Sequence, residues 1–331
     1  MQYDVYGLGN ALVDYEYEVT PLWLEQQGID KGVMTLMDED QQIDIMGSID
    51  HGAVEKASGG SGANSIIALA QMGGKAFYTC RVADDHDGTF YAQDMLDCGV
   101  DSNIVHKKHE DGTTGKCLVM VTPDADRTMN TFLGISAELD ESDLDFDALK
   151  ASNYLYMEGF LVSSDSARAA AIKARDFAHE HGIKTALSLA DPNMVKFFKE
   201  GLEEMIGDGV DLLFSNEEEA MGMTGTDDAY AAAAALKPYA NTFAITRGAE
   251  GALVYDGQDL IKIDPVPTKA IDTLGAGDMF AGAFLYGLSQ NMGFERAGQL
   301  ASLASSRMVS RFGPRFNLSE TRAILRDFEA A

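Results

Sequence analysis

The stretch 270-AIDTLGAGDMFAGAF-284 places three small residues, Gly275, Ala276 and Gly277, directly before a segment with the composition of a buried helix. A helix N-terminus has backbone N–H groups without intrahelical partners and carries the positive end of the helix dipole. Residues with almost no side chain let an anion approach those N–H groups closely. The stretch therefore predicts an anion-binding site at the start of a helix, with phosphate as the expected ligand.

Asp278 follows these small residues and suits proton transfer. A carboxylate at this place can take a proton from an attacking hydroxyl while the neighbouring N–H groups stabilise charge on a transferred phosphoryl group. The structural alternative is that Asp278 only complements the helix dipole and that the glycines only permit tight packing. The remainder of the chain decides between the two.

Composition narrows the class of protein. The chain has 331 residues, 46% of them hydrophobic, which favours one large α/β domain spanning 1–331. The formal charge of −28 would repel phosphate backbones and anionic lipid, so nucleic acid and membrane partners are not expected. No apolar run reaches the roughly 18 residues of a membrane span, and the first residues lack a signal-peptide pattern, so a cytoplasmic protein is expected. Three unpatterned cysteines suggest neither disulfides nor zinc.

Short apolar runs alternate with segments of helical period along most of the chain. This alternation predicts a mostly parallel sheet with helices on both faces. The expected helices cover 61–72, 164–181, 227–239 and nearly all of 275–331. The expected strands are 3–9, 76–82, 154–160, 184–190, 211–216, 242–248 and 251–256.

Two segments break the alternation. Residues 15–37 and about 104–133 carry alternating polar and apolar residues, and no helix is expected between their strands. Such strands would pair with each other and form a small β lid, inserted twice from the main domain. Its exposed strand edges would also allow a homodimer through the lid.

The stretch 272-DTLGAGD-278 resembles the D-T-x-G-A-G-D signature of the ribokinase, or pfkB, family of carbohydrate kinases. The resemblance covers essentially the whole chain. It implies a ribokinase-like three-layer α/β/α domain with a β lid, which uses ATP and Mg²⁺ to phosphorylate a hydroxymethyl group of a sugar or nucleoside. Four further segments are similar to family motifs in the same order: GLGNALVD (7–14), GGSGAN (59–64), NEEE (216–219) and TRGAEGA (246–252).

On the acceptor side, the resemblance implies that Asp278 is the catalytic base and that the amides of 275–277 form the anion hole. It also implies that Asp14, helped by Gly60 and Asn64, binds substrate hydroxyls. An ionised carboxylate accepts two hydrogen bonds from vicinal hydroxyls with good geometry. The alternatives are a solvated loop acid at Asp14 and an ordinary helix start capped by Ser61.

On the nucleotide side, the resemblance implies that Asn216 and Glu219 act through the water shell of Mg²⁺ and the phosphates. The alternative is a solvated acidic turn that favours the helix dipole. Thr246 and Gly248 are expected along the ATP molecule. Asp272 and Thr273 of the signature are also assigned to ATP binding, and the resemblance allows for a K⁺ site near this loop.

The acceptor is expected to be a nucleoside. GNALVD, RTMNTFLG (127–134) and EGFL (158–161) resemble the adenosine kinase branch of the family. A planar base needs flat apolar walls and few polar contacts. Core or lid packing is the alternative use of the apolar residues, while Arg127, Lys107 and Lys116 keep a free pentose or hexose open. The residues expected to bind the acceptor in addition to Asp14, Gly60 and Asn64 are Asn10, Leu12, Met34, Met129 and Phe160, with Leu36 beside them.

The sequence disfavours two other classes of protein. A dehydrogenase is disfavoured, because GLGNAL (7–12) has Leu12 where the dinucleotide fingerprint needs its third glycine. A non-catalytic nucleotide or sugar sensor is disfavoured, because such a protein has no need to keep Asp278, Asn216 and Glu219 together. A kinase is the function expected from the sequence.

Overall fold

The main sheet of the computed structural model, which describes residues 2–50, 52–109, 111–124 and 127–330, has nine strands in the described part of the chain. Seven run parallel, and two antiparallel strands close one edge. The spatial order is β14 (Leu260–Ile263), β13 (Ala252–Tyr255), β12 (Ala240–Thr246), β11 (Val210–Asn216), β10 (Lys184–Ser188), β9 (Ser152–Glu158), β1 (Tyr3–Leu8), β5 (Ala76–Thr79) and β6 (Val100–Ser102).

Both faces of this sheet are buried because its strands present apolar side chains to each side. Along β9, Tyr154 and Tyr156 pack into one core, while Leu155 and Met157 pack into the other. The first core is covered by α3 (Ser61–Gln71), α4 (His86–Asp97), α10 (Ala276–Ser289), α11 (Phe294–Met308) and α12 (Leu318–Glu329). The second is covered by α5 (Phe146–Lys150), α6 (Asp165–His181), α7 (Pro192–Ile206), α8 (Glu217–Thr224) and α9 (Ala229–Ala235).

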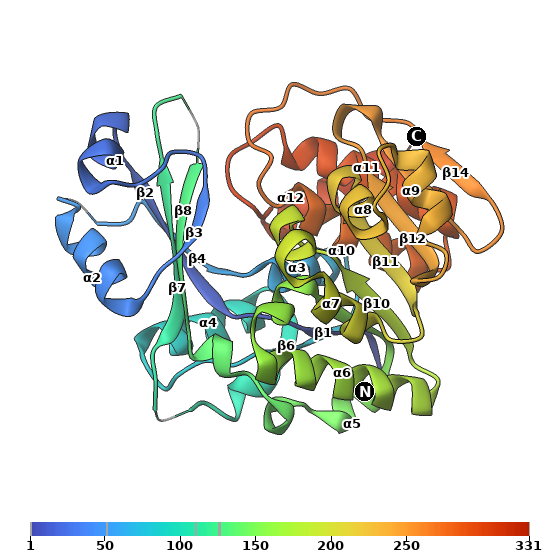
Figure 1. Ribbon diagram of the computed structural model, residues 1–331, viewed down its shortest axis with the longest axis horizontal. Coiled ribbons are helices and arrows are strands. Elements are labelled where there is room, and N and C mark those ends of the chain that lie inside the picture. Colours follow the sequence, from blue (N-terminus) through green and yellow to red (C-terminus); the bar gives the residue numbers. More distant parts are fainter. Residues whose placement is uncertain (1, 51, 110, 125–126, 331) are drawn as a thin grey trace.

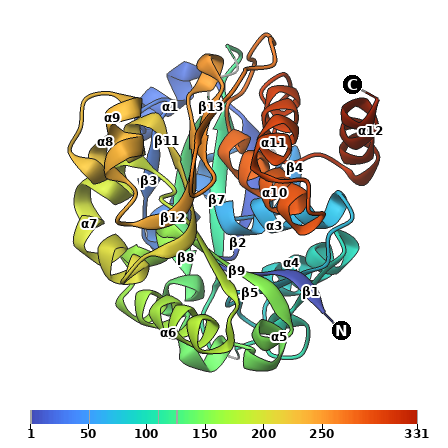
Figure 2. The same ribbon diagram turned by 90° about the vertical axis from the view of Figure 1, so that its right-hand side faces the viewer.

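The three layers are visible in Figure 2, where the strands lie between α8 and α9 on one side and α10 and α11 on the other. The expected three-layer α/β/α fold with a mostly parallel sheet is confirmed. Among the described residues, no helix combines the length and the apolar character needed to cross a membrane.

A smaller five-stranded sheet stands beside the main body (Figure 1). Its order is β3 (Met34–Leu36), β8 (Arg127–Gly134), β7 (Thr114–Val121), β2 (Leu12–Glu18) and β4 (Glu55–Gly59). Helices α1 (Pro21–Gln27) and α2 (Glu39–Ser48) cover the face turned away from the body. They share a small core with the strands, made of Tyr17, Val19, Leu24, Leu118 and Met120. The smaller sheet together with α1 and α2 is called the lid below.

The lid differs from its sequence-based description in two respects. The expectation that 15–37 holds no helix is wrong: Thr20 caps α1, Pro21 occupies its first turn, and Gly28 ends it in the left-handed conformation. The first lid segment also continues past residue 37, through α2 to the end of β4 at Gly59. Within the second expected segment, 104–133, residues 110 and 125–126 lie outside the described part of the chain.

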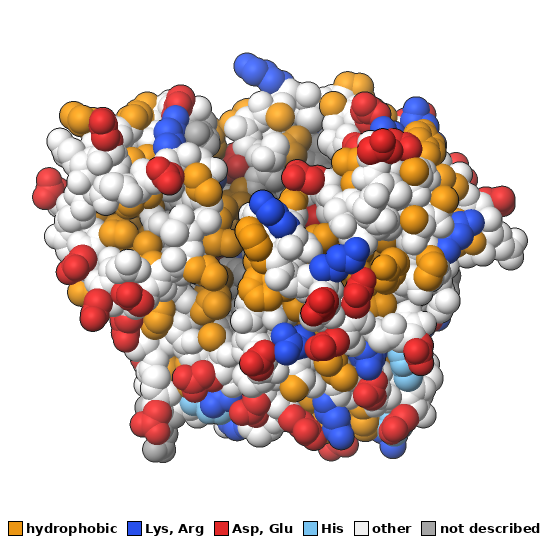
Figure 3. Space-filling view, viewed as in Figure 1, with side chains coloured by type: hydrophobic (Ala, Val, Ile, Leu, Met, Phe, Trp, Pro, Cys, Tyr) orange, Lys and Arg blue, Asp and Glu red, His pale blue; other side chains and the backbone are white. Residues whose placement is uncertain are grey.

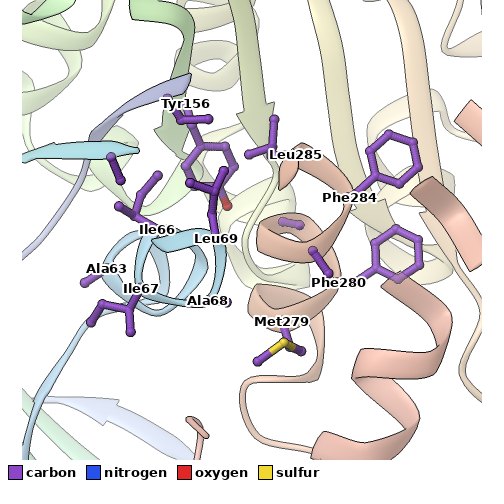
Figure 4. Packing of buried hydrophobic residues seen from close by; sticks show 14 of the residues in the cluster. Ala63, Ile66, Ile67, Ala68, Leu69, Tyr156, Met279, Phe280, Phe284 and Leu285 are labelled. Carbon is purple, nitrogen blue, oxygen red and sulfur yellow. The ribbon is translucent and has the colours of Figure 1, made fainter. Parts of the chain in front are cut away.

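Helices α3 and α10 pack closely against each other (Figure 4). This packing brings the glycine-rich segment 59–64, at the start of α3, next to the segment 275–277, at the start of α10. A Cβ atom at Gly282 of α10 would lie 2.8 Å from the Ala68 Cβ and closer still to the Ser65 carbonyl oxygen of α3. Only glycine permits this approach. Asp278 lies one turn before Gly282, and Ser61 lies one turn before Ser65, so the same contact sets Asp278 beside Ser61.

Candidate active site

Three connected hollows lie at the carboxyl ends of the parallel strands, and the lid contributes walls to two of them. The inner cavity, of about 210 Å³, and the central cleft, of about 710 Å³, share Ser61, Phe160 and Asp278 in their walls. The central cleft and an outer chamber of about 510 Å³ share Thr273 and Gly277. The start of α10 therefore stands at the middle of one continuous hollow, which opens between the two lobes seen in Figure 3.

Asp278 is held by the first turn of α3. Its Oδ1 accepts a hydrogen bond from the Ser61 hydroxyl at 2.6 Å, and its Oδ2 accepts one from the Asn64 amide at 3.2 Å. Burial raises the pKa of Asp278 to about 6, although both hydrogen bonds lower it. A carboxylate with this pKa is ionised at neutral pH and can accept a proton. Ser61 does not cap α3: Gly60 occupies the cap position and makes no side-chain bond.

The amides ahead of Asp278 are open to the hollow to different degrees. Gly275 begins α10 in the left-handed conformation, with φ of 71°. The Ala276 amide donates to the Thr273 carbonyl at 3.3 Å and is thus engaged within the turn. The structure gives no hydrogen bond from the Gly277 amide to any described residue, and a Cβ at Gly277 would meet no atom within 4 Å. Gly277 therefore offers the most exposed donor of the predicted anion hole.

Asp14 and Asn64 supply polar groups to the inner cavity. The Asp14 carboxyl packs against the backbone of Gly59 and accepts no hydrogen bond from the described residues. Burial raises the pKa of Asp14 to about 7, against the opposing charges of Arg315 and Arg127. Asn64 is buried, and its Oδ1 has no partner among the described residues. Both side chains thus have acceptors available for hydroxyl donors.

Glu158 is a site residue that the sequence interpretation did not identify. It is fully buried at the end of β9, where its Oε1 accepts from the Asn10 amide at 2.7 Å and its Oε2 from the Gly62 amide at 2.6 Å. Burial raises the pKa of Glu158 to about 7. The carboxylate fixes the turn after β1 to the start of α3, beside Asn10 and Gly60. Its place at the carboxyl end of an expected strand was the available signal.

The other walls of the inner cavity are apolar. The expected residues Leu12, Met34, Met129 and Phe160 all line it. Helix α7 adds Met194 and Phe198, and its backbone departs from helical angles at Phe198 (φ −129°, ψ 26°), which forms a kink. The remaining apolar side chains in these walls are Leu36, Cys117, Val119, Leu133, Leu274 and Pro314.

The three basic residues that kept a sugar acceptor open do not line the inner cavity. Lys107 lies 3.4 Å from the Asp143 carboxylate, and Lys116 lies 3.3 Å from that of Asp87. Arg127 contacts the central cleft, where its Nε lies 2.8 Å from an Asp272 oxygen.

Asp272 joins three parts of the molecule. Besides Arg127 of the lid, its carboxylate accepts from the Leu274 amide at 3.0 Å and from the Gly313 amide at 3.1 Å. It lines the central cleft, so the ATP-binding role expected for it remains a prediction. The bonds observed for its side chain hold the loop before α10 in place.

Asn216 and Glu219 line the central cleft and bond to each other. Asn216 donates to Glu219 through its backbone at 2.9 Å and its side chain at 2.6 Å, while Glu219 donates back through its amide at 2.8 Å. This is a capping box at the start of α8. Burial raises the pKa of Glu219 to about 7.

Asn216 and Glu219 could hold a metal ion only indirectly, through water molecules bound to the ion. Among the described residues, no group of three or more His, Cys, Asp or Glu side chains could hold a metal. Glu219 already accepts two hydrogen bonds, yet Mg²⁺ keeps several waters and needs few carboxylates. The predicted indirect role of Glu219 is compatible with this arrangement.

The outer chamber contains the other residues expected along the nucleotide. Thr246, Gly248 and Thr273 line it, beside Ala276 and Gly277 at the start of α10. Additional walls come from segments in which no site residue was expected: Pro265–Thr268, and Ser302, Ser305 and Ser306 on α11.

Comparisons with known proteins agree with this architecture. Residues 35–322 match the model of the pfkB family carbohydrate kinases. A probable sugar kinase from Rhizobium etli CFN 42 is 31% identical, and adenosine kinase from Sinorhizobium meliloti is 33% identical. For each structure the TM-score is 0.89, with 99% of this chain and 100% of the other covered. Ribokinase from Lactococcus lactis is 38% identical over 129 residues, which are 38% of this chain and 42% of that protein.

The fold and the cleft define an ATP-dependent kinase with an alcohol group as acceptor. The chain belongs to the pfkB family of carbohydrate kinases, whose members act on sugars or on nucleosides. Kinases of this family generally use ATP and Mg²⁺.

Proposed function

We propose that this kinase phosphorylates the 5′-hydroxyl of a nucleoside resembling adenosine. The observation that carries the proposal is the composition of the inner cavity. Its polar groups gather at one end: Ser61 and Asn64 donate to Asp278, the Asn10 and Gly62 amides donate to Glu158, and Asp14 lies in the same walls. Most of its other walls are apolar and come from the lid and from α7. A ribose suits the polar groups, and a planar base suits the apolar walls.

The chain's own groups supply the steps of the transfer. Asp14 and the free Asn64 oxygen accept hydrogen bonds from the acceptor's hydroxyls and orient it. Asp278 takes the proton of the attacking hydroxyl as the O–P bond forms and the bond to the leaving ADP oxygen breaks. The Gly277 amide, with its neighbours, stabilises the charge on the transferred group. ATP would occupy the outer chamber along Thr246, Gly248 and Thr273, with its phosphates in the central cleft.

Asn216 and Glu219 would hold the water shell of Mg²⁺ next to the phosphates. When bound, the ion supplies charge neutralisation to the phosphate oxygens. A K⁺ requirement, expected near the loop that contains Asp272, remains a prediction. Rates compared in potassium and tetramethylammonium chloride at equal ionic strength test it, and equal rates would contradict it.

The acceptor is tested by measuring ADP release with Mg²⁺ and K⁺ present. The panel contains adenosine, inosine, guanosine, cytidine, ribose and fructose. We expect kcat/KM to be higher for the nucleosides, adenosine among them, than for ribose or fructose, because only nucleosides have a ribose for the polar groups and a planar base for the apolar walls. Higher kcat/KM for ribose or fructose would overturn the nucleoside assignment and support the sugar alternative.

A homodimer through the lid also remains a prediction. Helices α1 and α2 cover one face of the lid, so pairing would use the edge strand β3, which is three residues long. Light scattering over a range of protein concentrations measures the molar mass, and a monomer mass throughout would contradict the dimer.

A further inference from the structure

A guanidinium group lies behind Asp14. Arg315 belongs to the loop between α11 and α12, and 14% of its side chain is exposed. Asp14 and Arg315 both line a further hollow of about 570 Å³, called the rear cavity. The rear and inner cavities share Asp14, Val119, Leu274 and Pro314 in their walls. Asp14 therefore faces the acceptor on one side and the hollow that contains Arg315 on the other.

Arg315 is anchored by residues other than Asp14. Its Nη1 donates to the Ser58 hydroxyl at 3.0 Å, and its Nη2 donates to the Asp94 carboxylate at 3.1 Å. The same Asp94 oxygen accepts from the Ser58 amide at 2.9 Å. Ser58 precedes Gly59, the residue against which the Asp14 carboxyl packs. Between Arg315 and Asp14, which both belong to the described part of the chain, the structure gives no hydrogen bond or ion pair, so the guanidinium is fixed in the cavity that Asp14 also lines without pairing with its oxygens.

This placement matters because Asp14 binds hydroxyls only as an acceptor. A protonated carboxyl would lose part of its accepting capacity, and a direct bond from an arginine would compete with the substrate. A positive charge held at a short distance favours the ionised form without either cost. Burial raises the pKa of Asp14 to about 7, and Arg315 is the strongest group that opposes this rise.

Other charged and titratable groups face Asp14 from each element packed around it. Arg127 on β8 favours its ionisation, whereas Asp278 on α10 and Glu16 on β2 disfavour it. Cys117 on β7 and Tyr91 on α4 also face it, and burial raises the pKa of both above their ordinary ranges. Neither is charged at neutral pH, so Arg315 and Arg127 are the groups that favour the ionised form of Asp14.

We propose that Arg315, anchored by Asp94 and Ser58, is a positioning residue for acceptor binding: it presents a fixed positive charge to Asp14 from the rear cavity and leaves both Asp14 oxygens to the substrate hydroxyls. This inference rests on the proposed function only in assigning Asp14 to acceptor binding. It applies to a sugar acceptor as well as to a nucleoside, because both present vicinal hydroxyls.

The test is the pH dependence of acceptor binding in Arg315→Met. Loss of one opposing charge moves a carboxyl pKa by about one unit or more. The KM for the acceptor should then rise about fivefold at pH 7 and return to the wild-type value near pH 9, where Asp14 is ionised in both proteins. The values of kcat and of KM for ATP should stay unchanged. Arg315→Lys, which keeps the charge, should restore most of the wild-type profile.

Arg311→Met is the matched control. Arg311 lies in the same loop and lines the same rear cavity, but it pairs with Glu320 at 2.7 Å. Its replacement should leave the pH dependence of the acceptor KM unchanged. A purely structural role for Arg315 would instead lower kcat and raise both KM values at every pH, and that result would overturn the proposal.

A binding measurement separates this inference from the proposed function. Calorimetric titration of the acceptor into Asp278→Asn, and into the double variant that also has Arg315→Met, reports the Kd without turnover. An identical pH dependence of Kd in the two proteins contradicts the role of Arg315. Failure of the proposed function gives a different result, since wild-type kcat/KM is then higher for ribose or fructose than for every nucleoside.

Discussion

At the scale of single residues, Asp278 has the strongest assignment. Replacing it with Asn should lower kcat by about a thousandfold or more, because the proton acceptor is lost. The variant should still fold, since the Asn64 amide can rotate to present its unpartnered oxygen to the amide group introduced at this position. Wild-type kcat should fall as the pH is lowered through about 6, the pKa of Asp278. Steady-state kinetics from pH 5 to 8 measure both effects, and near-normal kcat in the variant would contradict the base role.

Asp14, the carboxylate proposed to bind the acceptor, should lower stability at neutral pH. The folded pKa of Asp14 is about 7, above the ordinary value of a carboxyl, so the native state binds more protons than the unfolded state between about pH 4 and 7. The free energy of unfolding therefore falls as the pH rises through this range. Asp14→Asn should be more stable than wild type by about 1 kcal/mol at pH 8, with a smaller difference at pH 4.

Urea unfolding at the two pH values measures this difference. Asp264→Asn removes a carboxylate whose side chain is 89% exposed, and it provides the matched control. A gain in stability at pH 8 that is equal in both variants would show that burial of Asp14 is not its cause.

At the scale of elements, two glycines at the start of α10 should behave in opposite ways. A Cβ at Gly277 meets nothing within 4 Å, and alanine favours a helix over glycine by about 1 kcal/mol, so Gly277→Ala should be slightly more stable. Its methyl group would occupy the space that a phosphoryl group needs, and kcat should fall about tenfold or more. Gly275 has φ of 71°, and its Cβ would lie 2.6 Å from the Pro314 carbonyl oxygen, so Gly275→Ala should lose about 2 kcal/mol.

Thermal unfolding and ADP release on the same preparations check this pair. The prediction requires Gly277→Ala to raise the stability and Gly275→Ala to lower it. A Gly277→Ala enzyme with unchanged kcat would show that the anion hole does not need the space at this position.

Phe198, at the kink in α7, should contribute to binding the nucleobase of the acceptor. Phe198→Ala should raise the KM for adenosine about tenfold, because an aromatic ring in the cavity wall is lost. Phe197, which is 67% exposed and does not line the inner cavity, is the neighbouring control. The KM for ribose, measured in the same variants, should not change with Phe198. Equal effects of the two substitutions on adenosine would contradict a base site at the kink.

The elements also show what the sequence could predict. Strands with continuous apolar runs and helices bounded by glycine were identified, since these signals are local. The alternating pattern of 15–37 predicts strand throughout and hides the lid helix α1, although Thr20, Pro21 and Gly28 mark its ends. The sequence interpretation does not include helices α4 and α7 either. It therefore does not include Met194 and Phe198 of α7 among the residues of the inner cavity.

The site residues divide in a similar way. Candidates in glycine-rich segments, such as Asp278, Asn64 and Asp14, could be predicted because the backbone requirement leaves a mark in the sequence, and all three line the inner cavity. Glu158 and Arg315 could not be placed, because their roles depend on contacts with residues distant in the chain, Gly62 for the first and Ser58 for the second.

At the scale of the whole molecule, the net charge of −28 should make stability depend on salt. Repulsion among carboxylates destabilises the compact state and is screened as the Debye length shortens from about 30 Å at 0.01 M to below 10 Å. We expect Tm to rise by several degrees between 0.01 and 0.5 M salt. Calorimetric scans in potassium chloride and in choline chloride should agree if screening is the cause. A Tm that falls with salt would show that surface ion pairs outweigh the repulsion.

The lid and the body contribute different groups to the candidate site, and this separation has an evolutionary consequence. The lid supplies Met34, Leu36, Met129 and Leu133 to the acceptor's surroundings, while Asp278 and the anion-binding amides belong to the body. The lid has its own small core, separate from the two large ones. Substitutions at these four lid positions can therefore change acceptor preference without altering Asp278 or the amides at the start of α10. We expect this separation to let acceptor preference change between sugars and nucleosides while the groups that carry out the transfer stay the same.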